Sequence, residues 1–418
     1  MVKTDDVVNK SRLGNKAVEG NLIDALPNDI LVSILSLLNS EEVARTSILS
    51  HRWRFINWVN NTLKSHQGTT IDEFTVCFVV DVDVDEGSYC KPDINGWIIF
   101  AFEKKVRSLH LDFKKSWENY NPWENYTLTT QFLSNYTIGS LEVLRLIDVE
   151  VTGEVVEYIL SACPLLEVLR IEGSESLAQL NVSGPSLKLK SLEIIHCLEL
   201  EYIEISSVPN LMSLTYFGEI VIGVVKDVPN LIKASISGFF ASHFMKKNCH
   251  YSGLLSQLKT LVLDLSMEQI CRSSSKLPKL KNLKHLELVL DGEDFHSLVC
   301  CVKFLKMSPF LHRLTLKVEN LGRFRKFREV NEEEPEKAHR HLKLIEFIGF
   351  VGLAVDMELI LCLLKSAVSL KRLTIVPCTK YYFGAVIPTK DAELISAARR
   401  RAKKLETRLP PSAELVIL

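Results

Sequence analysis

The chain has 418 residues, of which 47% are hydrophobic and 24% are charged, a composition that supports a sizeable core and argues against wholesale disorder. Its 50 Lys and Arg residues nearly balance its 51 Asp and Glu residues, so the chain lacks the overall positive field of a general nucleic-acid binder. The most apolar stretch, 358–368, is interrupted by Lys365 and is shorter than the ~18 residues that a membrane-spanning helix needs.

Residues 1–21 are polar and lack a continuous apolar core, so we expect a flexible N-terminal tail rather than a secretory signal. The ten cysteines include no CxxC pair, and this favours reduced thiols in the nucleus and/or the cytoplasm. His243, Cys249 and His250 lie close in sequence, but no fourth ligand for zinc is evident. We therefore expect neither a metal nor another cofactor.

Residues 22–66 have the pattern of three short helices. Pro27 suits the first turn of a helix, and Ser40 and Ser50 can cap the next two. The first helix carries an apolar stripe that is too broad for a simple surface helix, formed by Ile30, Leu31, Ile34, Leu35, Leu37 and Leu38. Because about forty residues cannot bury such faces alone, the module requires a partner.

The rest of the chain repeats one pattern, apolar-x-x-apolar-x-apolar. Clear copies begin at Leu141, Leu166, Leu189, Leu211, Leu258, Leu283, Leu311, Leu342 and Leu370, and weaker copies begin at Ile71, Val106 and Leu231. From Leu141 onward the copies start 20 to 31 residues apart, close to the period of about 20–29 residues that is typical of leucine-rich repeats.

The spacing of this motif predicts an α/β repeat solenoid. Its last two apolar positions are two residues apart, so a strand points both to one face and the residue between them to the other. Stacked units then form a horseshoe with a parallel sheet on the concave face. Helices or irregular segments should cover the convex face, and helical spacing within 155–160, 298–305 and 360–364 supports helices there.

Three segments resemble a known family. The residues Leu26-Pro27-x-Asp29-Ile30-Leu31 and the block RTSILSHRWR over 45–54 resemble the plant form of the F-box, although Asn39 stands where that family often has Pro, and His51 where Lys or Arg is usual. The segment 161–171 resembles the repeats of plant F-box/FBD/leucine-rich-repeat proteins. The C-terminal part resembles their FBD region. The resemblance predicts a tail (1–21), a three-helix F-box (22–66), leucine-rich repeats (67–335) and an FBD region with a basic C-terminal helix (336–418).

The resemblance implies a substrate-receptor subunit of a Skp-cullin-F-box (SCF-type) ubiquitin ligase, with no catalytic activity of its own. Its implied partners are a Skp-family linker, through it a cullin, and an unknown protein substrate, with no nucleic acid and no membrane. The linker contacts we expect are Leu26, Pro27, Ile30, Ile34, Leu35, Leu49 and Trp53, although some of these must instead form the core of the module. The alternatives are a module that only caps the repeats, and a protein-binding scaffold with no role in degradation.

Target binding should involve the residue that lies between the last two apolar positions of each repeat. These residues are Arg145, Arg170, Glu193, Thr215, Ser235, Val262, Glu287, Thr315, Glu346 and Thr374, and His285, Arg313 and Arg372 adjoin them. Arg145 and Arg170 occupy equivalent places and would form either a small anion site or part of a solvated face. The basic run 399–404 is either an import signal or the solvated face of a helix. No catalytic motif such as GxSxG or HExxH occurs.

Overall fold

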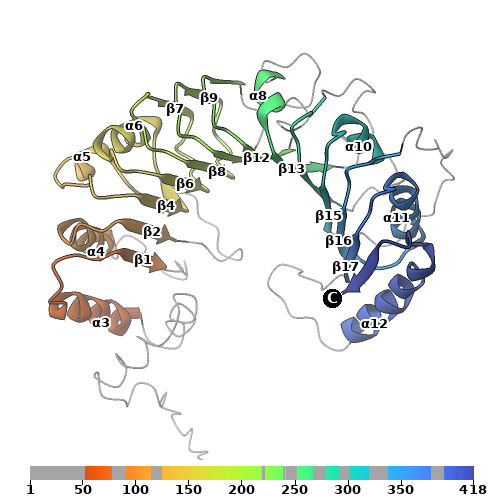
Figure 1. Ribbon diagram of the computed structural model, residues 1–418. Helices are drawn as coiled ribbons and strands as arrows, with labels where there is room; N and C mark the ends of the chain where they lie inside the picture. The colour runs from red at the N-terminus through yellow and green to blue at the C-terminus, as the bar shows by residue number, and fades with distance from the viewer. Residues whose placement is uncertain are drawn as a thin grey trace, which may run out of the picture.

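The computed structural model describes residues 52–77, 91–113, 125–218, 222–238, 241, 252–266, 279–291, 301–319, 338–377 and 390–418. These residues form an arch whose inner surface is one sheet of 13 parallel strands (Figure 1). Its strands, in spatial order, are β1 (Glu73–Cys77), β2 (Ser108–Asp112), β4 (Val143–Ile147), β6 (Val168–Glu172), β8 (Ser191–Ile195), β10 (Ser213–Phe217), β12 (Lys233–Ser237), β13 (Thr260–Ser266), β14 (His285–Asp291), β15 (Arg313–Glu319), β16 (Leu344–Phe350), β17 (Arg372–Pro377) and β18 (Glu414–Ile417).

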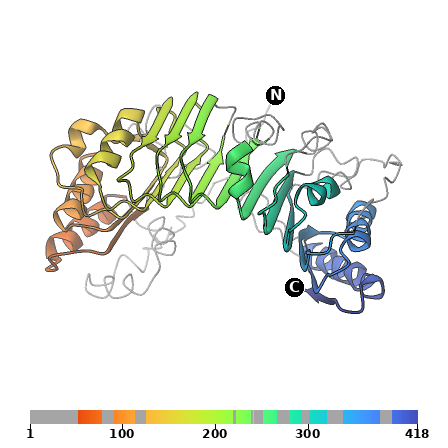
Figure 2. The same ribbon diagram turned by 45° about the horizontal axis from the view of Figure 1, so that its top comes forward.

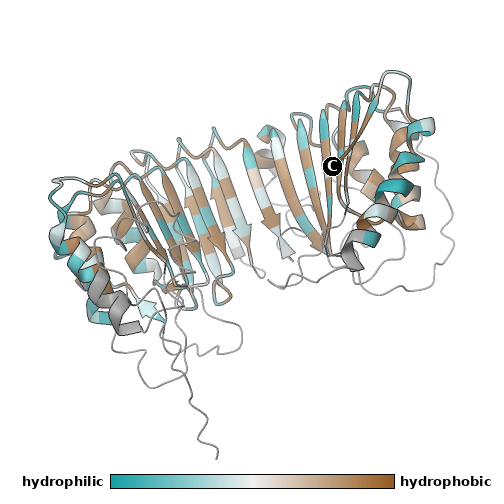
Figure 3. Ribbon diagram, turned by 90° about the horizontal axis from the view of Figure 1, so that it is seen from below, coloured by the Kyte–Doolittle hydropathy of each residue, from teal (hydrophilic) through white to brown (hydrophobic). Residues whose placement is uncertain are grey.

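Each copy of the motif supplies one strand of this sheet, and the predicted solenoid is confirmed. In β8, Leu192 and Ile194 are fully buried, as is Leu189, which opens the motif. The residue between them, Glu193, lies on the opposite face because side chains alternate along a strand. The same alternation of apolar and polar residues runs along the strands of the inner sheet (Figure 3). The weaker copies at Ile71, Val106 and Leu231 also end in strands, β1, β2 and β12.

Helices cover the outer side of the sheet toward both ends of the arch, and one short helix, α8, lies near its middle (Figures 1 and 2). They are α4 (Lys91–Glu103), α5 (Thr130–Leu133), α6 (Gly153–Ala162), α8 (Ser252–Gln257), α10 (Lys303–Met307), α11 (Ala354–Ser366) and α12 (Lys390–Lys403). The predicted helices at 155–160 and 360–364 therefore occur as α6 and α11. The helix predicted at 298–305 is described only from residue 301 onward, and α10 overlaps it there.

The middle repeats differ, because their outer side holds strands rather than helices. A second parallel sheet there contains β7 (Gln179–Ser183), β9 (Tyr202–Ser206) and β11 (Ile222–Lys226), and β3 (Tyr126–Thr127) pairs with β5 (Val149–Glu150) nearer the N-terminus. The three repeats with strands start only 20 to 23 residues before the next copy. A helix advances 1.5 Å per residue and a strand about 3.3 Å, so a short segment must be extended to return across the repeat.

A helix from the N-terminal module packs directly on the first repeat. Helix α3 (Arg52–Ser65) contacts α4, and Val59 and Leu63 lie against the hydrophobic core. Asn60 joins the two helices: its Oδ1 accepts a hydrogen bond from Trp97 Nε1 at 2.7 Å, and its Nδ2 donates to Asp93 at 2.9 Å. The end of this module is thus anchored to the repeat array at its first unit.

The C-terminal region continues the same stack through β16, α11 and β17. The turn from β16 into α11 is organised by Asp356, which is 2% exposed. Its Oδ2 accepts hydrogen bonds from the backbone N–H groups of Val351, Gly352 and Leu353 at 3.1, 2.8 and 3.1 Å. These donors precede or open the helix and have no partner within it, so the carboxylate satisfies them.

The basic run 399–404 lies at the end of α12 and in the turn that follows it. Ala398, Ala402 and Leu405 are buried against the core, whereas Arg399, Arg400 and Lys403 are exposed. The apolar stripe thus faces the stack and the basic side chains form the outer face of the helix. This arrangement favours the solvated-face interpretation of the run.

We predict that Asp356→Ala destabilises the C-terminal repeats, because it leaves three partly buried N–H groups without their acceptor. The expected loss in the free energy of unfolding is about 1–3 kcal/mol. Chemical denaturation followed by circular dichroism would measure it. Glu358→Ala, a carboxylate on the same helix with no role in the turn, is the matched control. Equal stability of the two variants would contradict this role of Asp356.

Candidate functional site

The inner face of the sheet carries its side chains in straight rows, because each strand pairs with the next in the same register. The middle row contains Thr75, His110, Arg145, Arg170, Glu193, Thr215, Ser235, Val262, Glu287, Thr315, Glu346, Thr374 and Val416. The first row lies two residues earlier in each strand and includes His285, Arg313, Leu344, Arg372 and Glu414. All the predicted target-binding residues therefore lie in these two rows, in two groups.

The N-terminal group centres on Arg170 in β6. Its guanidinium forms ion pairs with Glu172 of the same strand and, at 3.1 Å, with Glu193 of β8. Arg145 is its neighbour on β4 and has no carboxylate within 4 Å among the described residues. Because two carboxylates already neutralise Arg170, the structure favours a solvated face over a small anion site for these two arginines.

His110 adjoins Arg145 in the middle row. It is half-buried, and its Nε2 has no hydrogen-bond partner among the residues that the structure describes. Burial lowers the pKa of His110 below its ordinary 6.5, and the charges of Arg145 and Arg170 lower it further against the opposing effect of Asp112. The imidazole is therefore neutral at pH 7.

The C-terminal group consists of His285, Glu287, Arg313 and Arg372. His285 Nε2 lies 3.2 Å from Thr315 Oγ1, and burial lowers the pKa of this histidine, with Arg313 adding to the effect. Arg313 pairs with Glu346 at 2.6 Å, and Arg372 pairs with Glu414. Each of these arginines thus has a carboxylate partner on the neighbouring strand, so the C-terminal part of the inner face largely neutralises its own charges.

A further line of side chains, the edge row, lies one residue before each inner-sheet strand from β1 to β17 and is absent from the predicted site. Its described members are Asp72, Arg107, Glu142, Glu167, Lys190, Met212, Ile232, Lys259, Lys284, His312, Lys343 and Lys371. From Glu142 onward, each backbone N–H donates to the carbonyl of the row residue in the preceding repeat at 2.7–3.0 Å. In the sequence, the edge row corresponds to the second position of the repeat motif. A lysine or histidine stands at that position in LKTLVL, LKHLEL, LHRLTL, LKLIEF and LKRLTI.

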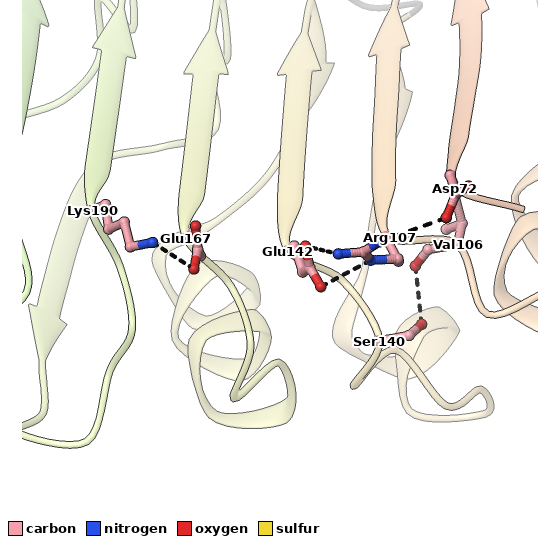
Figure 4. A network of polar contacts seen from close by, with 7 residues as sticks. All are labelled: Asp72, Val106, Arg107, Ser140, Glu142, Glu167 and Lys190. Atoms are coloured by element: carbon pink, nitrogen blue, oxygen red, sulfur yellow. Dashed lines mark hydrogen bonds and ion pairs between the residues drawn. The ribbon is translucent and has the colours of Figure 1, made fainter.

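The two halves of the edge row differ in charge. In the N-terminal half Arg107 pairs with Asp72 at 3.7 Å and with Glu142 at 2.8 Å, and Lys190 pairs with Glu167 at 2.7 Å (Figure 4). The C-terminal half contains Lys259, Lys284, His312, Lys343 and Lys371 in consecutive repeats. Within the described parts of the chain none of these lysines has a carboxylate within 4 Å, so this half presents positive charge.

Comparison with known proteins agrees with this architecture. Residues 62–393 match the family model described as the LRR domain of At1g61320/AtMIF1, and residues 23–64 match the F-box domain. The chain belongs to the plant F-box/FBD/leucine-rich-repeat family. The family predicted from the sequence is thereby confirmed.

Relatives in this family match much of the chain. The FBD-associated F-box protein At5g56370 of Arabidopsis thaliana is 26% identical over 426 residues, which cover 85% of this chain and 90% of the relative. The F-box/FBD/LRR-repeat protein At5g56420 from the same plant is 23% identical over 85% of this chain and 91% of its own. The putative F-box/LRR-repeat protein At5g02930, also of Arabidopsis thaliana, is 30% identical over 201 residues, only 41% of each chain.

The part of this family's pattern that would contact a linker lies mostly outside the described residues. This holds for Leu26, Pro27, Ile30, Ile34, Leu35 and Leu49, whereas Trp53 belongs to α3. His243, Cys249 and His250 also lie outside, and the described residues contain no group of three or more His, Cys, Asp or Glu arranged to hold a metal ion. None of the described helices combines the length and apolar character that crossing a membrane requires.

We predict that Arg145→Met raises the pKa of His110, because it removes a neighbouring positive charge that disfavours the imidazolium ion. In the wild-type protein the folded pKa lies below the unfolded value, so His110 reduces stability as pH falls below about 6.5. The variant should lose less stability over that range.

Titration of the histidine ring protons by NMR would measure this shift. Arg372→Met, which removes an arginine in β17, is the control and should leave the pKa of His110 unchanged. An unchanged pKa in Arg145→Met would contradict the closeness of these two side chains in the middle row.

Proposed function

We propose that this protein is the substrate receptor of an SCF-type ubiquitin ligase, in which its F-box docks a Skp-family linker and its repeats bind a protein target. The observation that carries the proposal is an F-box match at 23–64 followed directly by an arch with a 13-stranded inner sheet. An F-box implies a linker partner, and a parallel solenoid offers an extended concave surface of the kind that repeat proteins use for binding.

Such a receptor carries out no bond chemistry. It would hold a target lysine beside a ubiquitin-loaded enzyme that the rest of the complex supplies, and so raise the effective concentration of the reacting groups. This effect depends on a defined geometry between the two binding modules. The contact of α3 with α4, with Asn60 bonded to both Trp97 and Asp93, supports such a geometry, because it joins the last F-box helix to the first repeat.

In this proposal residues 22–66 bind the linker, and 67–335 together with 336–418 form one continuous stack that acts in the nucleus and/or the cytoplasm. The linker contacts are Leu26, Pro27, Ile30, Ile34, Leu35, Leu49 and Trp53. The target contacts on the inner face are Arg145, Arg170, Glu193, His285, Glu287, Arg313 and Arg372. Because most of the arginines among these are paired with carboxylates, they would orient a target by hydrogen bonds rather than attract it by net charge.

We predict that the double variant Leu26→Ala with Pro27→Ala abolishes co-purification with the Skp-family linker. The double change removes an apolar anchor and the residue that sets the start of the first F-box helix. Asn28→Ala changes the variable position of the same motif and is the matched control, which should still bind. Co-expression of the full chain with the linker, followed by affinity purification, would measure both. Undiminished binding of the double variant would refute the proposed docking mode.

A degradation role requires a second experiment, because linker binding alone is also compatible with a scaffold. Proximity labelling in a plant that expresses the full-length protein, with and without proteasome inhibition, would identify neighbouring proteins. A target that accumulates only under inhibition, and only with the wild-type F-box, supports the receptor role. Neighbours whose abundance is unchanged by inhibition would favour a non-degradative scaffold.

A further inference from the structure

The C-terminal half of the edge row places like charges side by side. Lys259, Lys284, His312, Lys343 and Lys371 lie on neighbouring repeats whose backbones are hydrogen-bonded to one another at these residues, with N–H to carbonyl distances of 2.8–2.9 Å. Strands in a sheet are about 4.8 Å apart, so Lys259 repels Lys284 and Lys343 repels Lys371. All four lysines are exposed. The row therefore offers positive charge, not compensated by a described carboxylate within 4 Å, to a negatively charged partner.

The electrostatic effect of these lysines is visible at His312, the central member. Partial burial lowers the pKa of His312 below 6.5, and the positive charges of Lys284 and Lys343 on either side lower it further, with His341 and His339 adding to the effect. The imidazole is thus neutral at pH 7. The row keeps four lysine charges, separated at its centre by a ring that can donate or accept a hydrogen bond.

Exposed apolar side chains adjoin this row. Phe310 is 42% exposed, and Lys284 Nζ lies 5.5 Å from the centroid of its ring. The ring of His341 lies 5.1 Å from the same ring. Leu344, which follows Lys343 directly, is 37% exposed. The surface therefore combines a line of cations with two apolar contacts.

We propose that this surface binds an acidic segment of the target protein, one in which Asp or Glu residues are interspersed with apolar residues. The inference rests on the proposed receptor function and specifies the class of target. The row from Lys259 to Lys371 spans four strand spacings, about 19 Å, which matches about six residues of extended chain. The acidic side chains would pair with the lysines while apolar ones contact Phe310 and Leu344.

The neighbouring rows favour a protein segment over a nucleic acid. Beside the edge row lies the first row, where Glu414 occurs, and next to it is the middle row, which contains Glu287 and Glu346. Glu346 and Glu414 pair there with Arg313 and Arg372, so these rows do not extend the positive charge of the edge row into the broad positive surface that a nucleic acid needs. A polypeptide is narrow enough to follow a single row, and Leu344 offers it an aliphatic contact that cannot stack on a base.

The test compares two double variants of the full chain, each co-expressed with the Skp-family linker and purified through an affinity tag on the receptor itself. Lys284→Gln with Lys343→Gln neutralises the cationic half of the edge row, and Arg107→Gln with Lys190→Gln removes two cations from the half that is already ion-paired. The probe is a fluorescent synthetic peptide of about ten residues in which Glu and Leu alternate. Controls are the same peptide with Gln in place of Glu, and an oligouridylate of equal charge. Fluorescence anisotropy measures the dissociation constants.

We expect the Glu-containing peptide to bind the wild type, the Gln-containing peptide not to bind, and the Lys284/Lys343 variant to bind the acidic peptide roughly tenfold more weakly. The Arg107/Lys190 variant should bind as the wild type does. Equal binding by the two variants, no binding of the acidic peptide to the wild type, or tighter binding of the oligouridylate would overturn the proposal. Linker binding, measured on the same samples, tests the F-box role independently, so the two proposals fail separately.

Discussion

Hydrogen bonding between parallel strands in one continuous register is the constraint on which the rest of this structure depends. Because each strand pairs with its neighbour residue for residue, a position in the repeat motif becomes a row across the whole sheet. Among the described strands this register shifts at the end of the β16–β17 pairing, between Ile348 and Phe350, which lies beyond the middle row. Gly349 lies at that point with a φ of +87°, and a Cβ there would meet the carbonyl oxygen of Val318 at 2.2 Å. A residue without a side chain therefore allows the stack to continue past the irregularity.

The outer side of the arch adapts to the length of each repeat, while the inner sheet stays constant. Long repeats close through helices such as α6 and α11, and the short ones close through β7, β9 and β11. Asparagines stabilise several of the turns that lead into the inner strands. The side-chain amides of Asn210, Asn230 and Asn282 each donate to a backbone carbonyl 21 to 26 residues earlier, at 2.7–2.8 Å. These side-chain hydrogen bonds lie in the turns where the chain enters an inner strand. Each of them connects one repeat to the preceding one.

Much of this fold could be predicted from the sequence because its determinants are local. The alternation of buried and exposed positions in LKSLEI gives the strand β8 and the burial of Leu192 and Ile194, and the apolar spacing before Pro164 gives α6. Side-chain contacts between different repeats were harder to predict from the sequence. The pairing of Arg170 with both Glu172 and Glu193 requires knowledge of which strands are neighbours, and it favours the solvated-face alternative over an anion site formed by two arginines. The edge row could not be predicted for the same reason. Lysines at the second motif position form a continuous charged row only when the five strands that follow them are known to be neighbours.

The balance of charge in the whole chain conceals a separation of charge along the arch. In the N-terminal half of the edge row Asp72, Glu142 and Glu167 pair with Arg107 and Lys190, whereas the C-terminal half holds four lysines and a neutral histidine. Net charge governs long-range attraction to polyanions, so this protein gains no general affinity for them. A row of lysines at strand spacing can still select a partner by short-range pairing, because salt screens charges more than about 8–10 Å apart more strongly than charges in direct contact. A receptor built in this way would discriminate by the sequence of a short acidic segment rather than by bulk charge.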